Sequence, residues 1–285
     1  MIGRVALIGM GMIGGSLAAA LRQHKLCEEI TAYDVDRKAL IKAFDLKLID
    51  NSAVSPCEAV RQADVVVLAV PVGATEEICC SMRDCLPEQA VLTDVGSVKE
   101  DVVKAVERGL GFLPSGFVPG HPIAGKELSG IEAASEDLFF GRRVILTPTS
   151  ETSPESLALI RQMWEGVGAV VEEMAIEYHD EVLAATSHLP HLLAFALVES
   201  LAKMGGSEDI FRYAAGGFRD FTRIASSDPT MWRDICLSNR NAILEVLNRF
   251  EDDLHQLSQA IAKGDAALLL DTFRHAKQTR DYFCH

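Results

Sequence analysis

Basic residues are scarce in this 285-residue sequence, which contains 27 lysines and arginines against 41 aspartates and glutamates and has a formal net charge of −14. A chain this acidic is repelled by nucleic acid and by anionic membrane surfaces, so neither is an expected partner. An anionic ligand would meet the same unfavourable field. Arginines and histidines that gather at one place in the fold are therefore candidate ligand-binding residues.

Membrane and export signals are also missing. The longest apolar runs are broken well short of the length needed to cross a bilayer, and the first predicted strand starts too close to Met1 to leave room for a signal peptide. No repeat, low-complexity tract or flexible linker is found. We therefore expect a cytoplasmic globular protein, and its length favours two tightly packed domains.

The seven cysteines form no CxxC pair, and the sequence has no HExxH motif. An odd number of cysteines without such spacing favours reduced, mostly buried thiols over disulfides or a zinc site. His188 and His191 are three residues apart, but zinc needs further ligands, so no metal is predicted.

The clearest feature that is present is a glycine-rich turn near the N-terminus. Residues 5–8 predict a buried strand and residues 12–21 a helix, joined by a turn that contains Gly9, Gly11 and Gly14. In a dinucleotide-binding unit such glycines permit the sharp turn, the approach of the pyrophosphate and the close packing of helix on strand. The backbone N–H groups at the start of the helix, at Met12 and Ile13, would face the phosphates.

An acidic residue follows at the spacing that this unit requires. The next predicted strand, residues 30–33, ends at Asp34, which is 20 residues after Gly14. A carboxylate there binds the ribose hydroxyls and repels a 2′-phosphate, so NAD is predicted in preference to NADP. Arg37 could partly accommodate that phosphate, which keeps NADP possible. A helix-capping role for Asp34 is the alternative.

Strands and helices alternate through residues 1–174. Helices are predicted over 37–44, 74–85 and from 154, and strands over 63–70, 89–93, 116–118, 144–147 and 169–173. This alternation predicts an α/β domain with a doubly wound, Rossmann-type parallel sheet. Ligands bind beyond the carboxyl ends of such strands, where the chain places Val70, Pro71, Ser97 and His121.

His121 is the candidate catalytic residue of this set. It precedes Pro122, which favours an extended conformation, and it lies in a predicted loop between glycines at the ligand edge. A solvated or capping histidine is the alternative interpretation.

Residues 175–285 predict an all-α domain. One long helix is expected over 178–203, kinked at Pro190, which would free a backbone carbonyl. A polar loop over 216–223 and a helix starting at Asp228-Pro229 follow. Six apolar residues then recur at spacings of four and three, which suits helix pairing or an ordinary core: Ile243, Leu247, Phe250, Leu254, Leu257 and Ile261.

Four motifs occur in order behind the glycine-rich turn: DVGSVK (94–99), GHPIAG (120–125), SHLPH (187–191) and GFRDFTRIA (217–225). Together they resemble the prephenate/arogenate dehydrogenases of tyrosine biosynthesis, over essentially the whole chain. The resemblance implies NAD-dependent oxidative decarboxylation of prephenate or arogenate by a homodimer joined through its helical domains. No residue distinguishes the two substrates. The sequence holds neither the regulatory nor the chorismate mutase domain of some relatives, so inhibition by tyrosine would have to act at or near the active site.

The resemblance also implies residue roles. His121 would be the base that removes the C4 hydroxyl proton, with a pKa around 6.5, and Ser97 would bind the same hydroxyl or hold the His121 tautomer. Arg223 would bind a substrate carboxylate, and His191 a second carboxylate or the side chain. Glu127 and Asp220 match an ionic gate of relatives, or are ordinary surface carboxylates.

Two other functions stay open. A β-hydroxyacid dehydrogenase has similar domains but typically relies on a lysine in the helical domain, where Lys203, near the end of the long helix, is that helix's only lysine. A non-catalytic NAD-binding sensor would have no need for Ser97 and His121 at one edge.

Overall fold

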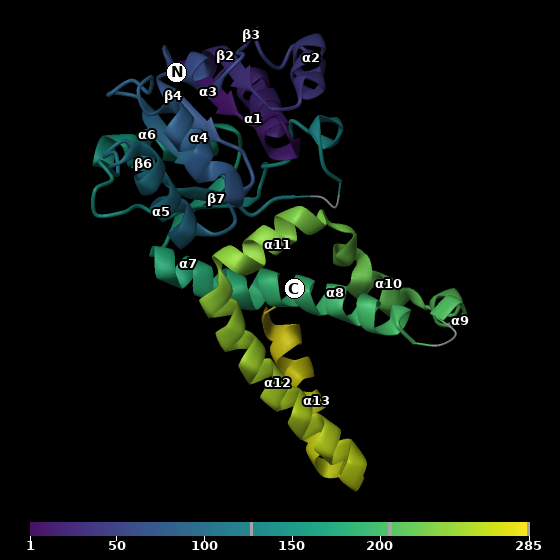
Figure 1. Cartoon of the computed structure of the whole chain (residues 1–285). Coiled ribbons are helices and arrows are strands. Elements are labelled where there is room, and N and C mark those ends of the chain that lie inside the picture. The colour runs from purple at the N-terminus through teal and green to yellow at the C-terminus, as the bar shows by residue number, and fades with distance from the viewer. Residues whose placement is uncertain (126–127, 205–206, 284–285) are drawn as a thin grey trace. The chain divides into compact units, whose positions relative to one another are not determined.

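The computed structural model describes residues 1–125, 128–204 and 207–283. Its contacts group the chain into two units, Met1–Arg240 and Asn241–His285, and Figure 1 labels many of their helices and strands. The domain boundary predicted after residue 174 lies inside the first unit and stays a prediction.

The larger sheet of the first unit has six parallel strands in the order β3-β2-β1-β4-β5-β6 (Figure 1). The strands are β1 Ile2–Ile8, β2 Cys27–Tyr33, β3 Asn51–Ser52, β4 Val65–Leu68, β5 Val91–Asp94 and β6 Phe117–Val118. The strand order changes direction between β1 and β4, and ligands of doubly wound sheets bind at that place. The predicted fold class is confirmed.

Helices cover both faces of this sheet because side chains alternate along its strands. In β1, Val5 and Leu7 belong to one core and Ala6 and Ile8 to the other, and all four are buried. The first core includes residues of α1 (Met12–Gln23), α2 (Arg37–Asp45) and α6 (Pro154–Gly166), and the second includes residues of α3 (Pro56–Val60), α4 (Thr75–Met82) and α5 (Lys99–Leu110). A strand covered on both faces reads as a continuous apolar run, which is the pattern of residues 5–8.

A second sheet carries His121. Strand β7 (Gly120–Pro122) runs antiparallel to β8 (Arg143–Leu146), which pairs in parallel with β9 (Val170–Glu173). His121 pairs with Ile145, so it lies in a short strand and not in the predicted loop. The extended backbone that a following proline favours is also strand backbone, and β8 supplies the partner.

One continuous helical stretch spans residues 176–202. It consists of α7 (Ile176–Leu183), a π-helical segment (Ala184–His188) and α8 (Leu189–Ala202). The distortion predicted at Pro190 takes the form of this wider turn, which accommodates a residue without an N–H. Side chains contact carbonyls of the turn: the Thr186 hydroxyl donates to Val182 O over 2.7 Å, and His191 Nδ1 lies 2.9 Å from Ser187 O.

By length and composition alone, this stretch is apolar enough to cross a membrane. The uninterrupted apolar runs are short, as expected, but they did not reveal this stretch, in which histidines, serines and threonines interrupt the runs while the mean hydropathy stays high. A core helix of a soluble protein passes the same test. This helix buries His179, Asp180 and His188 in a polar network, which would be costly in lipid.

Short helices complete the first unit: α9 (Ser207–Arg212), α10 (Gly216–Thr222), a 3₁₀ turn η4 (Arg223–Ser226) and α11 (Pro229–Ser238). The polar loop predicted over 216–223 is thus wrong, because residues 216–222 are helical. Its two glycines and charged residues suggested a loop, but Phe218 packs against Phe211 of α9 and α10 packs on α8. Tertiary packing here outweighs local propensity.

The second unit consists mainly of α12 (Arg240–Lys263) and α13 (Ala266–Phe283). The helix predicted from the apolar spacing is confirmed as α12. Few of its apolar side chains are covered: Leu254 is 53% and Ile261 68% exposed, and no described residue of α13 is buried. A unit this small cannot form a sufficient core alone.

One pair of cysteines is bonded, which corrects the expectation of reduced thiols. Cys57 in α3 and Cys85 after α4 form a disulfide with their Cα atoms 5.2 Å apart. The two residues are 28 positions apart and meet because α3 packs on α4, which cysteine spacing does not reveal. Cys27 and Cys79 are free and buried, and burial raises the pKa of both thiols. Disulfides are uncommon in reducing compartments, so this bond does not favour a cytoplasmic location.

Candidate active site

The turn between β1 and α1 has the geometry that a dinucleotide requires. Gly9 has a φ of +104°, and a Cβ there would lie 2.3 Å from the Ala69 carbonyl oxygen. A Cβ at Gly14 would lie 2.0 Å from the Gly9 oxygen. A Cβ at Gly11, in contrast, would meet nothing within 4 Å, so the backbone there is open to an approaching phosphate. These residues fit the predicted NAD cofactor.

The neighbouring cofactor residues gather around this turn. Gly11 is the N-cap of α1 and offers no side-chain acceptor, so the first N–H groups of the helix, at Met12 and Ile13, suit an anion. Val70 has a methyl group 3.3 Å from the position of a Cβ at Gly9, and Pro71 follows it. Contact of these residues with the cofactor stays a prediction.

Asp34, half-buried after β2, joins the turn to the next strand. Its Oδ2 accepts a hydrogen bond from Met10 N over 2.6 Å, and its Oδ1 accepts one from Asp36 N over 2.7 Å. The N-cap of α2 is Asp36, which accepts from Lys38 N, so the capping alternative belongs to Asp36. Each Asp34 oxygen keeps a further lone pair for a ribose hydroxyl. Arg37, the first residue of α2, is exposed.

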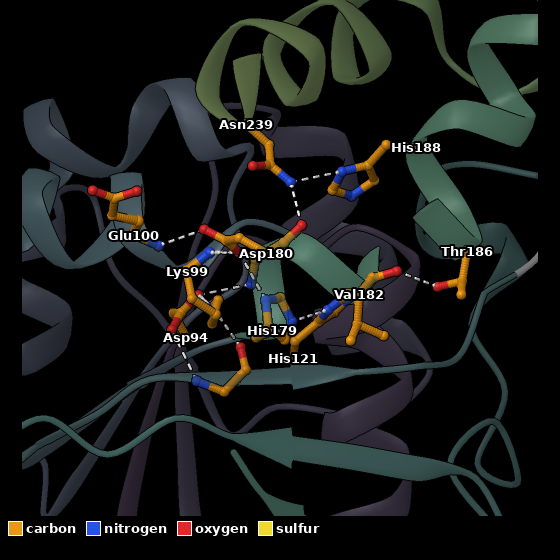
Figure 2. A network of polar contacts seen from close by, with 12 residues as sticks. Asp94, Lys99, Glu100, His121, His179, Asp180, Val182, Thr186, His188 and Asn239 are labelled. Atoms are coloured by element: carbon orange, nitrogen blue, oxygen red, sulfur yellow. Dashed lines mark hydrogen bonds and ion pairs between the residues drawn. The ribbon is translucent and has the colours of Figure 1, made fainter. Parts of the chain in front are cut away.

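His121 ends a chain of buried hydrogen bonds (Figure 2). Its Nδ1 lies 2.9 Å from Nε2 of His179, and Nδ1 of His179 lies 2.7 Å from Oδ1 of Asp180. Among the residues that the structure describes, Nε2 of His121 has no hydrogen-bond partner. The three side chains come from β7 and α7, far apart in the sequence.

The pKa of His121 lies well below its ordinary value. Burial is the main cause, and the nearby charges of His179, Lys99 and His188 lower it further. The expectation of a pKa around 6.5 is therefore corrected. His121 is neutral at pH 7 and available as a proton acceptor.

A buried ion pair holds the backbone beside His121. Lys99 is fully buried, and its Nζ pairs with the Asp94 carboxylate and donates to the Gly120 carbonyl over 2.7 Å. Asp94 in turn accepts from Gly120 N over 3.1 Å and from Gly96 N over 2.7 Å. Burial lowers the pKa of Lys99, whereas Asp94 and Asp180 raise it. The pair thus fixes both the strand that carries His121 and the loop that carries Ser97.

Besides its contact with His179, Asp180 binds the backbone at the start of α5. Its Oδ1 accepts from Lys99 N over 2.8 Å, and its Oδ2 accepts from Glu100 N over 2.9 Å. It therefore caps a helix whose own N-cap, Val98, has no acceptor side chain. Burial alone would raise the pKa of Asp180, but hydrogen bonds from His179, Lys99 N and Glu100 N bring it below its ordinary value.

Ser97 is half-buried between β5 and α5 and has no side-chain hydrogen bond among the described residues. Nδ1 of His121, through which Ser97 was expected to hold the tautomer, contacts His179. Contact of Ser97 with the substrate hydroxyl or with the cofactor stays a prediction.

The predicted substrate residues come from elements that pack together. His191 of α8 stacks on Trp232 of α11 with ring centroids 3.7 Å apart, and burial lowers its pKa. Arg223 is exposed at the start of η4, which packs against α8, and Asp220 is exposed on α10. Glu127 lies outside the described residues. Their roles toward a substrate stay predictions.

Four residues of this site had no role from the sequence: Asp94, Lys99, His179 and Asp180. Asp94 and Lys99 are the first and last residues of the DVGSVK motif, and only their burial sets them apart from surface charges. The other two form a polar, titratable pair inside a long apolar helix, which is the signal that could have singled them out.

A glycine-rich turn at the switch point of a doubly wound sheet, with a buried neutral histidine at the carboxyl-end edge of that sheet, defines a dinucleotide-dependent dehydrogenase. Comparison with known families narrows this class. Residues 17–173 match the family of prephenate dehydrogenase nucleotide-binding domains, and residues 175–275 match the family of prephenate dehydrogenase dimerization domains. The chain belongs to the prephenate dehydrogenase family.

Named relatives match over nearly the full chain. A cyclohexadienyl dehydrogenase of Zymomonas mobilis is 39% identical over 97% of this chain and 94% of its own length. A prephenate dehydrogenase of Bacillus subtilis is 37% identical over 97% of this chain and 75% of its own length. The crystal structure of a prephenate dehydrogenase from A. aeolicus, in complex with hydroxyphenyl propionate and NAD+, has a TM-score of 0.92 and 41% identity and covers 99% of this chain and 98% of that one.

Membership of the prephenate dehydrogenase family excludes the alternative that the chain is a β-hydroxyacid dehydrogenase. Lys203, the lysine on which that alternative depended, is the C-cap of α8, and its side chain is 72% exposed and paired with Glu199. A surface lysine of this kind does not have the burial that catalytic lysines require.

Proposed function

We propose that the chain catalyses the NAD-dependent oxidative decarboxylation of prephenate, of arogenate, or of both, in tyrosine biosynthesis. The observation that carries this proposal is His121, a buried neutral base at the ligand edge, with Nδ1 engaged by His179. The family supplies the reaction, and the glycine-rich turn supplies a fit for the dinucleotide.

The reaction requires little chemistry of the protein beyond positioning and one proton. NAD+, held by the glycine-rich turn and Asp34, would supply the acceptor for the hydride that leaves ring carbon C4. Nε2 of His121 takes the proton of the C4 hydroxyl as the C–H bond breaks. The C1 carboxylate then leaves as carbon dioxide, its bonding electrons make the ring aromatic, and the phenolate oxygen takes the proton back from His121. One hydride and one carbon dioxide leave the substrate, and no net proton is released.

Prephenate carries two carboxylates, which an acidic chain must hold by local cations. Arg223 is proposed to pair with one of them in a charge-assisted contact. His191 is proposed to contact the second carboxylate or the substrate side chain. Because Nδ1 of His191 contacts the Ser187 carbonyl, Nε2 is the atom left to face a ligand.

The direct test is turnover by the purified chain. NADH formation is measured with prephenate and with arogenate, each with NAD+ and with NADP+, and the aromatic product is identified by chromatography. We expect turnover with at least one substrate and NAD+. Absence of turnover with both substrates, in a protein shown to bind NAD+, would favour the non-catalytic sensor.

We also propose that the chain is a homodimer joined through its helical region, and that it acts in the cytoplasm although the Cys57–Cys85 disulfide does not favour that location. Residues 175–275 match a dimerization domain. Helix α8 is apolar over most of its surface, yet only Leu189 and Ala194 of its residues are buried, and α13 buries none of its described residues. A second copy would cover such surfaces.

The dimer is tested by a charge at Leu254, which is 53% exposed on α12. Leu254→Glu should dissociate the dimer or unfold the chain, as measured by sedimentation at micromolar concentration. Phe112→Glu is the matched control, because Phe112 is 59% exposed and lies in the α/β region. A stable, active monomer of the unmodified protein would contradict the proposal.

A further inference from the structure

We infer that His179 and Asp180 are positioning residues for the reaction, acting as a hydrogen-bonded relay, Asp180–His179–His121, that holds His121 in the one tautomer able to accept the substrate proton (Figure 2). The inference rests on the proposed function of His121 as the base.

The Asp180 carboxylate determines which atom donates and which accepts in each hydrogen bond of the relay. Ionised Asp180 can only accept hydrogen bonds, so the atom 2.7 Å from it, Nδ1 of His179, carries a hydrogen. A neutral imidazole has one N–H, so Nε2 of His179 holds a lone pair. Nδ1 of His121, 2.9 Å away, must then be the donor. The lone pair of His121 is thereby placed on Nε2.

The carboxylate that starts the relay cannot turn away. Asp180 is held by the N–H groups of Lys99 and Glu100 at the start of α5. Its own backbone carbonyl accepts from Asn239 Nδ2 over 2.8 Å, and Asn239 also contacts Nδ1 of His188 at 3.1 Å. His179 is fully buried and Asp180 nearly so, which prevents water from replacing either partner.

The relay also acts when His121 becomes charged. Three groups of the neighbouring elements lie near it: His179 from α7, His188 from the π segment and Lys99 from α5. The carboxylate of Asp180 is bonded to His179, and that of Asp94 is paired with Lys99. Lys99 disfavours a positive His121, as protonated His179 or His188 would. The two carboxylates favour the imidazolium that forms during proton transfer, but the charge of Asp94 is offset by Lys99, which leaves Asp180, reached through His179, as the stabilising charge.

Variants at His179 test the relay better than variants at Asp180, because Asp180 also caps α5. His179→Phe fills a similar volume and removes the acceptor for His121. His179→Gln keeps a side-chain oxygen that can accept from Nδ1 of His121. His24→Gln, at an exposed histidine after α1, is the control for replacing a histidine.

We expect kcat to fall by about 10- to 100-fold in His179→Phe, less than for loss of the base itself, since the wrong tautomer then competes. The KM for the substrate and the Kd for NAD+ should change less than about threefold, because His179 is proposed to bind neither ligand. The acidic limb of the kcat profile should move, because His179→Phe removes both the acceptor of the imidazolium and a neighbour whose charge lowers the pKa of His121. His179→Gln should recover part of kcat. A purely structural role would instead lower thermal stability and raise KM in both variants without moving the acidic limb.

A second measurement needs no turnover. Nitrogen-15 NMR of the histidine side chains in the full-length protein reports each tautomer, and His121→Asn identifies the His121 signal. We expect His121 of the unmodified protein to carry its hydrogen on Nδ1, and His179→Phe to lose that preference. If the unmodified protein shows the hydrogen on Nε2, or if a folded His179→Phe keeps kcat within about twofold, the relay is wrong. If the tautomer is as expected but no substrate turns over, the proposed function fails and the relay geometry stands.

Discussion

The two halves of the active site are built in different ways. The cofactor half, Gly9 to Gly14 with Asp34, comes from one strand–turn–helix–strand segment near the N-terminus. The proton half, Asp94, Lys99, His121, His179 and Asp180, joins β5, α5, β7 and α7 through buried polar contacts. The first half depends on local backbone shape and the second on long-range packing. A change in one half should therefore leave the function of the other nearly intact.

His121→Asn should give the largest difference between the two halves, because it should impair proton transfer and leave cofactor binding unchanged. Asparagine keeps a similar size and hydrogen-bonding capacity but cannot accept the C4 hydroxyl proton, so kcat should fall by about 10² to 10⁴. The Kd for NAD+, measured by fluorescence titration, should change little because the cofactor half is untouched.

The pH profile gives a control for this result. Because burial lowers the pKa of His121, the acidic limb of kcat in the unmodified protein should lie well below pH 6.5. That limb should vanish from the residual activity of His121→Asn. Near-normal kcat, or an unchanged acidic limb, would place the base elsewhere, with His191 as the next candidate.

Acid should unfold the protein in and around the proton half, because His121 and His179 of that half and the neighbouring His188, joined to Asp180 through Asn239, are all buried. Burial lowers the pKa of His188 from 6.5 to about 4, and it also lowers the pKa values of the other two. The unfolded chain then binds more protons, so the free energy of unfolding falls as the pH drops below 6.5. For His188 alone this amounts to about 3 kcal/mol by pH 4.

Urea unfolding of His188→Phe between pH 7 and pH 4 measures this contribution. The variant should show a shallower loss of stability with acid than the unmodified protein, whatever its stability at pH 7. His24→Phe, at an exposed position, should keep the original slope. Equal slopes in all three proteins would show that His188 takes up its proton without unfolding.

The same contrast explains which features could be predicted from the sequence. The glycine-rich turn and Asp34 are neighbours in sequence as well as in space, so their spacing alone predicts the cofactor half. His121 was found because a strand end and a proline mark it. Its partners His179 and Asp180 are 58 residues and more away, and no local pattern indicates that α7 meets β7.

Errors in the sequence interpretation have the same origin. Residues 216–222 form a helix because α8 and α9 pack against it, and Cys57 meets Cys85 because α3 packs on α4. The lowered pKa of His121 follows from burial that only the folded chain supplies. Each of these features depends on contacts between distant segments, whereas the Rossmann-type sheet depends on periodic patterns within segments.

A change in the helical region should act on substrate binding and spare both halves. Arg223→Ala removes a proposed charge-assisted pair with a carboxylate, which contributes roughly 1.5–3 kcal/mol. Because such a contact is equal in ground and transition states, KM should rise at least about tenfold at nearly constant kcat. Steady-state kinetics and the Kd for NAD+ check this prediction. A normal KM with a collapsed kcat would move Arg223 into the chemistry.

The smallest effect is expected within the cofactor half, at Asp34. Its carboxylate has two tasks, since it accepts from Met10 N and Asp36 N and is proposed to repel a 2′-phosphate. Asp34→Asn removes the charge while keeping an oxygen for one of these N–H groups. Loss of about 1 kcal/mol of repulsion in a solvated site should narrow the preference for NAD+ over NADP+ by about fivefold in kcat/KM.

Arg37 supplies the opposite control for this prediction. It is exposed three residues after Asp34, so Arg37→Ala should widen the preference for NAD+ if its guanidinium reaches the phosphate. The kcat measured at saturating substrate and cofactor should stay the same in both variants, because neither residue belongs to the proton half. If the unmodified protein used NADP+ with equal or better efficiency, Arg37 would outweigh Asp34. The carboxylate would then serve only to hold Met10 and the glycine-rich turn, and the acidic residue at this spacing would be a structural feature of the turn, with no part in selecting the cofactor.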